Sequence, residues 1–269
     1  MNINEIIVYY EKGNSLKACS REFKISVYKI KKALQENNIQ IRSQKEQTKI
    51  ENIRRTKSVN HYYFSTLNSE SVYLIGFLAG DGYIHPKRNL IKIGLSAIDK
   101  EFIEQVREKL EIERESTEYQ TTKGFDVIDL SFSSMQIKND LSKYHVVNNK
   151  TKKGITMKEI PENLKWHYIR GYFDADGCYD YYFNHRIRIT SFLPNILNEI
   201  KEFSKVGSYT KEKTRNIYTY TVYGKDCEYF IKNMYKDATW WLSRKRNKII
   251  QKINSHETET LHTEDEKIC

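Results

Sequence analysis

Two short stretches of the sequence share one pattern, an apolar run followed by a small residue, an aspartate and a glycine. They are YLIGFLAGDGY at residues 73–83 and YIRGYFDADGCY at residues 168–179. Each run predicts a buried helix that ends at the glycine. Asp81 and Asp176 then stand at the negative pole of a helix dipole, which disfavours a carboxylate by about 0.3–1 kcal/mol. Asp-Gly is also a common turn, which would explain one copy, but two copies indicate a shared compensating partner.

The segments around the two motifs also repeat. From Ser69 onward, each copy predicts a helix, two alternating strands, an amphipathic helix, two more strands and a final helix. Asp99 is expected to cap the amphipathic helix of the first copy, and Met135 to face inward from its final helix. The sequence therefore predicts an α+β fold, a pseudo-symmetric tandem of two αββαββα domains at residues 69–165 and 166–255.

Residues 1–43 predict three short helices, with Ser15 and Ser26 capping the second and third. Val27, Ile30 and Leu34 are expected to face inward from the third helix. Its expected outward side chains include Tyr28, Lys29, Lys31 and Lys32. The segment resembles the small helix-turn-helix modules of resolvases and phage regulators, whose last helix enters the major groove of DNA, although any three-helix bundle would show a similar periodicity. Residues 44–68 predict a basic linker along the phosphates, and residues 256–269 an acidic, disordered tail.

The charge balance favours a polyanionic partner. The chain has 45 Lys and Arg against 35 Asp and Glu, a net charge of +10. It also has 20 Tyr and 3 Trp, and aromatic and cationic side chains together suit nucleic-acid contacts. A merely soluble, lysine-rich protein is the alternative. The strand and loop cations expected to contact DNA are Lys87, Arg88, Lys92, Arg186, Arg188, Lys211, Lys213 and Arg215.

Cysteine usage and hydropathy restrict the location of the protein. The four cysteines are scattered without a Cys-x-x-Cys pair, which supports neither a zinc site nor a disulfide framework. The sequence has no run of about 18 apolar residues and no signal-peptide pattern. We therefore expect a monomeric, cytoplasmic protein in a reducing environment, with neither a membrane nor a protein partner.

The motif helices also carry small residues four positions apart, which lets another backbone approach closely. These residues are Gly76 and Gly80 in the first motif, and Gly171 and Ala175 in the second. We expect the two helices to form a domain interface that brings Asp81 and Asp176 together. Two neighbouring carboxylates repel unless a cation joins them. A divalent metal, Mg²⁺ with Mn²⁺ as a substitute, would suit these oxygens, with the carbonyls of Gly80 and Ala175 as further candidate ligands.

The sequences LIGFLAGDG and IRGYFDADG resemble the paired signature of LAGLIDADG homing endonucleases. The resemblance covers about two thirds of the chain. It implies that the helices form the domain interface, that Asp81 and Asp176 bind metal, and that the two sheets form a saddle on double-stranded DNA. The implied activity is site-specific, metal-dependent cleavage of both strands at a long asymmetric target. Two departures are Ala79, at the place of the motif's first aspartate, and Ile169-Arg170, in place of Leu-Ala.

The family also uses a lysine near the metal in each half. Lys150 and Lys245 each follow the motif aspartate of their own copy by 69 residues, which predicts equivalent positions and a catalytic role. Two alternatives remain, a LAGLIDADG-derived DNA-binding regulator without cleavage and an intron RNA maturase. A regulator would be expected to lose one or both motif aspartates, and both are present.

Overall fold

The computed structural model describes residues 3–57, 59–181 and 183–253, and of residues 52–57 it describes the backbone alone. The chain divides into two compact units, Met1–Ser58 and Val59–Cys269. The tail expected at residues 256–269 lies outside the described residues. In the described ranges, no helix is long and apolar enough to cross a membrane.

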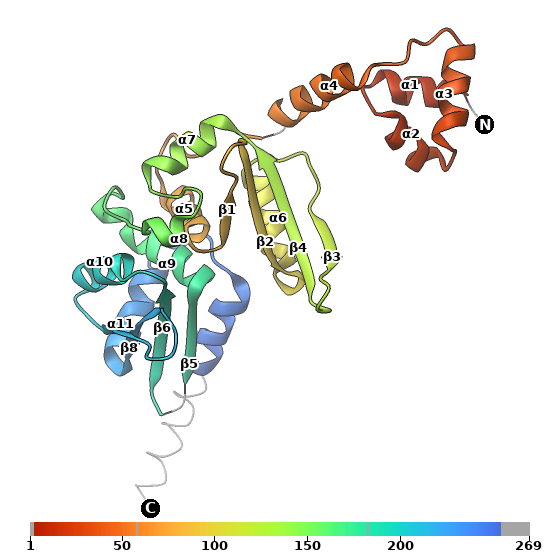
Figure 1. Cartoon of the computed structure of the whole chain (residues 1–269). Coiled ribbons are helices and arrows are strands. Elements are labelled where there is room, and N and C mark those ends of the chain that lie inside the picture. The colour runs from red at the N-terminus through yellow and green to blue at the C-terminus, as the bar shows by residue number, and fades with distance from the viewer. Residues whose placement is uncertain (1–2, 58, 182, 254–269) are drawn as a thin grey trace, which may run out of the picture. The chain divides into compact units, whose positions relative to one another are not determined.

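The first unit is helical (Figure 1). Its helices are α1 (Ile3–Glu11), α2 (Leu16–Phe23), α3 (Val27–Glu36) and α4 (Gln44–Lys57). Ser15 caps α2 by accepting a hydrogen bond from the amide of Ala18, and Ser26 caps α3 in the same way. Ile30 and Leu34 are fully buried, whereas Val27, expected to face inward, is 37% exposed because it opens the first turn of α3.

The expected linker at residues 44–68 is largely folded. Helix α4 occupies Gln44–Lys57, and the Gln47 side chain donates a hydrogen bond to the carbonyl of Gly13 at 3.0 Å. From Val59 onward the chain belongs to the second unit, where Phe64 is buried. The sequence did not predict helix α4, because a low apolar periodicity does not reveal a helix held by polar contacts.

The second unit contains two copies of one arrangement, so the predicted α+β tandem is confirmed. The first copy comprises α5 (Ser69–Asp81), β1 (Gly82–Ile84), β2 (Leu90–Ser96), α6 (Lys100–Lys109), β3 (Thr117–Gln120), β4 (Asp126–Ser133) and α7 (Met135–Lys143). The second comprises α9 (Lys165–Asp176), β5 (Gly177–Tyr181), β6 (His185–Ser191), α10 (Asn195–Ser204), β7 (Ser208–Lys211), β8 (Tyr218–Tyr223) and α11 (Gly224–Tyr235). Short α8 (Lys150–Lys153) follows α7 in the first copy, and residues 243–253 are also helical.

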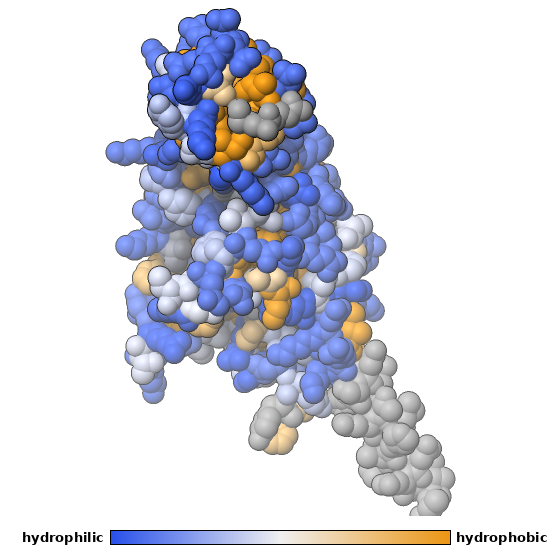
Figure 2. All heavy atoms as spheres, turned by 90° about the vertical axis from the view of Figure 1, so that its right-hand side faces the viewer, coloured by the Kyte–Doolittle hydropathy of each residue, from blue (hydrophilic) through white to orange (hydrophobic). Residues whose placement is uncertain are grey.

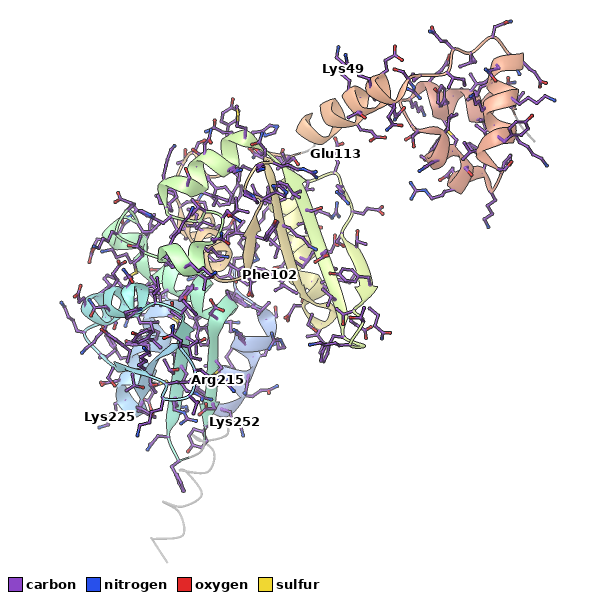
Figure 3. The ribbon with its side chains drawn as sticks, in the orientation of Figure 1. Lys49, Phe102, Glu113, Arg215, Lys225 and Lys252 are labelled. Atoms are coloured by element: carbon purple, nitrogen blue, oxygen red, sulfur yellow. The ribbon has the colours of Figure 1, made fainter. Side chains whose placement is uncertain are left out.

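The two antiparallel sheets have the same strand order, β1-β2-β4-β3 and β5-β6-β8-β7. Their registers also agree, because Gly82 pairs with Ile93 and Gly177 pairs with Ile189. In each sheet the buried strand residues alternate with accessible ones, and helices pack on the buried side, as Phe102 of α6 does (Figure 3). Equivalent sites in the two copies can therefore be compared residue by residue.

Two details of the first copy differ from expectation. Met135 is 64% exposed, because it begins α7 directly after the capping residue Ser134. Asp99 occupies the capping position of α6 but makes no side-chain cap. Its carboxylate instead accepts hydrogen bonds from the Arg244 guanidinium at 3.0 and 2.9 Å. Both carboxylate oxygens of Asp99 are thus used in charge-assisted hydrogen bonds to one guanidinium.

Candidate active site

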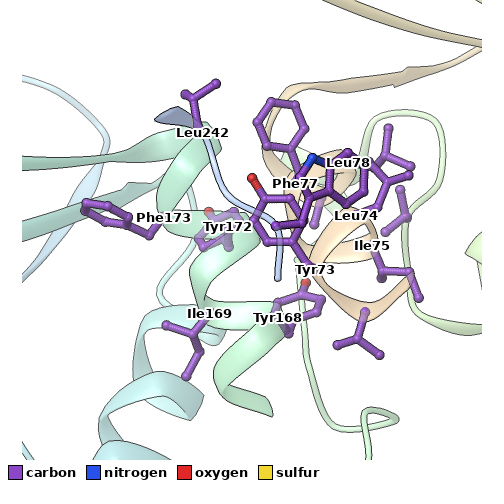
Figure 4. Close-up of a cluster of buried hydrophobic side chains, with 14 of the residues drawn as sticks. Tyr73, Leu74, Ile75, Phe77, Leu78, Tyr168, Ile169, Tyr172, Phe173 and Leu242 are labelled. Atoms are coloured by element: carbon purple, nitrogen blue, oxygen red, sulfur yellow. The ribbon is translucent and has the colours of Figure 1, made fainter. Parts of the chain in front are cut away.

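Helices α5 and α9 lie backbone against backbone at their middle (Figure 4). A methyl group built on Gly171 would lie 1.9 Å from the carbonyl oxygen of Tyr73, and one on Gly76 would lie 2.1 Å from that of Tyr168. Both distances are far shorter than any real contact. Glycine at these two positions is therefore a packing requirement, and the helices around them bury Phe77 and Phe173 completely.

One turn further along, the next pair of small residues lies beside the acids. A methyl group on Gly80 would lie 2.3 Å from the Ala175 methyl and 3.0 Å from Oδ2 of Asp176. The carboxylate of Asp176, from α9, therefore lies against the end of α5, the helix that ends with Asp81. Both motif aspartates thus stand at the shared end of the helix pair.

We expect Gly80→Ala to be repaired by a second substitution. Alone, it should destabilise the protein by about 1–3 kcal/mol through overpacking, because its methyl group meets that of Ala175. Adding Ala175→Gly removes the clash with the Ala175 methyl, leaves the 3.0 Å contact with Asp176 Oδ2, and should recover at least half of that loss. Thermal unfolding of both single variants and the double variant measures this coupling. Simple additivity of the two losses would mean that the two positions do not touch.

The two acids lie in a strongly coupled electrostatic environment. Desolvation by the surrounding protein raises the pKa of Asp81, and the positive charges of Lys245 and Lys150 oppose that rise. Desolvation, together with the negative charge of Asp81, raises the pKa of Asp176 to about 6. Holding both carboxylates ionised is therefore unfavourable without a further cation.

The two lysines hold equivalent places. Lys150 Nζ donates a hydrogen bond to the carbonyl of Gly82, and Lys245 Nζ donates one to the carbonyl of Gly177 at 2.6 Å. These glycines follow the two motif aspartates directly. Burial lowers the pKa of both lysines, while Asp81 and Asp176 act in the opposite direction. At the end of each motif helix, a lysine from much later in the same copy is therefore hydrogen-bonded beside the aspartate.

The lysines differ in how firmly they are held. Lys245 Nζ also donates to the carbonyls of Phe173 at 2.8 Å and Ala175 at 3.3 Å. Its three hydrogen bonds therefore go to the last turn of α9 and to the glycine that follows it. Of the candidate carbonyl ligands, that of Ala175 is therefore shared with Lys245. Lys150 is nearly buried and bonds the single carbonyl of Gly82. Lys245 thus donates to three carbonyls of its own copy, whereas the bond of Lys150 is to one.

The sequence did not predict the residues that hold the segment carrying Lys245. Asp174, buried in α9, accepts hydrogen bonds from the Leu242 amide and the Tyr73 hydroxyl, both at 2.8 Å. Arg244 is bound by Asp99 of the first copy. The motif pattern did place Asp174 on the helix. Its partner, the Leu242 amide, lies 68 residues later in the chain and is beyond any local pattern.

Arg170, the motif's most unusual residue, is completely buried. Its guanidinium donates to the carbonyls of Trp240 at 2.9 Å and Met234 at 2.8 Å, and lies over the Tyr73 ring. Burial lowers its pKa from the usual value. The departure from the motif therefore fixes the chain that precedes Lys245, rather than altering the acids.

The expected DNA-contacting cations lie in two kinds of place. Loops carry the exposed Lys87, Arg88, Lys213 and Arg215, the last seen between β7 and β8 in Figure 3, and Lys211 ends β7. Strand cations lie on the sheet faces away from the helices and are paired with acids. Lys92 bonds Asp129, and both Arg186 and Arg188 bond Asp180. In the first unit, Tyr28, Lys29, Lys31 and Lys32 are all exposed on α3. The surface seen in Figure 2 is mostly hydrophilic.

The donor set at the helix ends is small. Within residues 3–57, 59–181 and 183–253, no three His, Cys, Asp or Glu side chains gather as a metal-binding group. Two carboxylates with raised pKa values and nearby backbone carbonyls nevertheless fit a hard divalent cation that keeps several waters. Such a cation would take its remaining ligands from water or a phosphate.

Two matching αββαββα copies, joined through close-packed helices that end in paired aspartates, define a tandem α+β protein with one shared acidic centre. The family model described as LAGLIDADG-like domain matches residues 68–144 and 163–234, more than half of the chain. The protein belongs to this family. No curated protein matches the chain at a significant level.

Solved structures agree in fold. The chain is similar to I-SmaMI bound to an uncleaved DNA target in the presence of calcium ions, with 12% identity, a TM-score of 0.51, and coverage of 73% of this chain and 94% of that one. It is also similar to the I-LtrWI LAGLIDADG homing endonuclease bound to target DNA, with 15% identity, a TM-score of 0.49, and coverage of 72% and 92%. At 12% identity, the likeness to I-SmaMI concerns the fold alone.

Proposed function

We propose that this protein is a metal-dependent, site-specific endonuclease that cuts both strands of a long asymmetric DNA target. The observation that carries the proposal is the pair of motif aspartates at one shared helix end, each with its own lysine. Family membership and the fold shared with I-SmaMI, which is seen on uncleaved DNA with calcium ions, support it. The asymmetry of the target follows from the different surface residues of the two copies.

Asp81 and Asp176 would hold the divalent metal, with the carbonyls of Gly80 and Ala175 as further candidate ligands. When bound, Mg²⁺ or Mn²⁺ would supply an activated water and stabilise the leaving oxygen at a scissile phosphate. Lys150 and Lys245 lie within electrostatic reach of both acids, so they would offset negative charge that builds up when a phosphate approaches. The bonds of Lys245 to three carbonyls suit a positioning role as well.

Mg²⁺-dependent cleavage of a randomised duplex library by the full-length protein tests this function. We expect cuts in both strands at one enriched sequence, lost when EDTA replaces Mg²⁺. Tight, selective binding without cutting in either Mg²⁺ or Mn²⁺ would contradict the proposal and favour a DNA-binding regulator. Stronger competition by structured RNA than by duplex DNA would favour a maturase.

The paired acids also predict a pH-dependent response to Mg²⁺. The pKa of Asp176 is about 6 in the folded protein, above its ordinary value of 3.8. This group therefore stabilises the fold below pH 3.8 and loses that contribution as pH rises through 6. A metal ion binds the ionised carboxylate of Asp176 and not its protonated form. We therefore expect Mg²⁺ to raise Tm by about 4–10 °C at pH 8, at a concentration of about 100 Kd, and by far less at pH 5.

The matched control is Asp176→Asn measured at both pH values. Buried Asp174, whose pKa is also about 6, remains in this variant, so its ordinary pH dependence of Tm persists while the Mg²⁺ response at pH 8 disappears. An equal rise of Tm with Mg²⁺ at pH 5 and pH 8 would exclude Asp176 as a ligand.

A further inference from the structure

On the exposed face of the second sheet, one carboxylate binds two arginines. Asp180 Oδ1 accepts a hydrogen bond from Arg186 Nε at 2.6 Å, and Oδ2 accepts one from Arg188 Nη2 at 2.8 Å. Asp180 of β5 stands directly opposite Arg186 of β6. Because residues two apart on a strand share a face, a single aspartate fixes both arginines on one surface.

The aspartate lies deeper than the arginines it holds. Its side chain is 26% exposed, against 34% for Arg186 and 42% for Arg188. Partial burial would raise the pKa of Asp180, but the hydrogen bonds and charges of the two arginines lower it overall. The carboxylate therefore stays ionised beneath two cations whose outer ends remain accessible. Tyr223 stands opposite Arg186 on β8.

This arrangement leaves the two arginines with different donors. Asp180 engages Nε of Arg186 and therefore uses neither terminal nitrogen of that guanidinium. Arg188 uses Nη2 for Asp180, and its Nε is buried. A guanidinium recognises guanine by donating two parallel hydrogen bonds to N7 and O6 in the major groove. Asp180 leaves Arg186 two terminal nitrogens for that pair of hydrogen bonds, whereas it leaves Arg188 one.

We propose that Asp180 is a positioning residue for DNA specificity, which holds Arg186 so that it recognises a guanine in the major groove. This proposal rests on the proposed function, because it places duplex DNA on the exposed sheet face. A two-stranded antiparallel ribbon fits the major groove, and strand residues facing away from the helices reach the base edges. The fixed side chain also loses less rotamer freedom on binding than a free arginine would.

The first copy offers a natural comparison. Lys92 occupies the register position of Arg188 and bonds Asp129 at 2.5 Å. An ammonium group is a compact point charge without a planar fork, so Asp129 neutralises this cation without orienting it for a base. We therefore expect the Asp129 pair to affect overall affinity, and the Asp180 pair to affect base preference.

The experiment is a binding selection of the full chain on a randomised duplex library in EDTA, with no cutting. The native protein should enrich a site that contains a guanine preferred by about 10- to 100-fold over other bases. Asp180→Asn should reduce that preference about tenfold at the same position, while affinity for unselected duplex stays equal or rises, since a negative charge leaves the DNA-facing surface. Arg186→Lys should lose the same preference while its charge is retained.

Asp129→Asn is the matched control and should leave the guanine preference unchanged. Unfolding curves of all variants check that each one is folded. If folded Asp180→Asn keeps the full preference, or if Arg186→Lys does, the proposal is wrong. If the native protein enriches no duplex at all, the proposed function itself fails, which is distinguishable because no base preference then exists to lose.

Discussion

Replacing either motif aspartate with asparagine should reduce double-strand cleavage by at least about 10³-fold, while DNA binding stays within about threefold of the native value. Asp81 and Asp176 end two helices that meet at Gly80 and Ala175, so they offer one shared acidic centre. Asparagine keeps the shape but provides no negative charge for a metal. Binding should persist, because loss of a carboxylate also removes repulsion toward phosphates.

The measurement compares the native protein, Asp81→Asn and Asp176→Asn on the duplex enriched from the library, with cleavage and binding followed separately. Asp126→Asn serves as the matched control, because this exposed aspartate begins β4 and takes no part in the helix pair. It should cut at the native rate. Full cleavage of both strands by either motif variant would show that the metal centre lies elsewhere.

Gly171→Ala should destabilise the second unit by at least about 3 kcal/mol, or prevent its folding. Intrinsic helix propensity favours alanine over glycine by about 1 kcal/mol, so local structure alone predicts the opposite sign. The added methyl group would lie 1.9 Å from the carbonyl oxygen of Tyr73 and 2.7 Å from the amide nitrogen of Phe77. Both are backbone atoms of α5, which cannot move aside as a flexible side chain could.

Thermal unfolding tests this result, with an expected fall in Tm of about 6–12 °C for a folded variant. Ala175→Gly is the control, because it lies one turn later on the same helix and creates no clash. Its loss should be near the propensity cost of about 1 kcal/mol. A Gly171→Ala protein as stable as the native one would mean that α5 and α9 do not pack at this distance.

The exposed cations of the sheets show what a sequence pattern can and cannot predict. Strand alternation placed Lys92, Arg186 and Arg188 on the accessible faces, as the structure has them. It did not reveal that each of these cations has an acidic partner. Asp180 meets Arg186 only through the register of β5 on β6, and Asp129 meets Lys92 only through that of β4 on β2.

The segment that carries Lys245 shows the same limit at longer range. The equal offsets of Lys150 and Lys245 from their motif aspartates were visible in the sequence, and the structure places both lysines on the carbonyl that follows the acid. The partner of Asp99 was not visible, since Arg244 lies 145 residues away. The helix α4 was also missed, because its contact with Gly13 is polar.

The sequence by itself determined the helices and strands of the two copies, their twofold repetition and the small residues that let two helices approach. These features depend on local hydrogen bonding and on periodic burial, which leave a regular spacing along the chain. Only the tertiary structure decided which charges meet, how firmly each lysine is held, and which methyl group would strike a backbone carbonyl. Those outcomes depend on strand register and helix packing, which join residues that no local spacing relates.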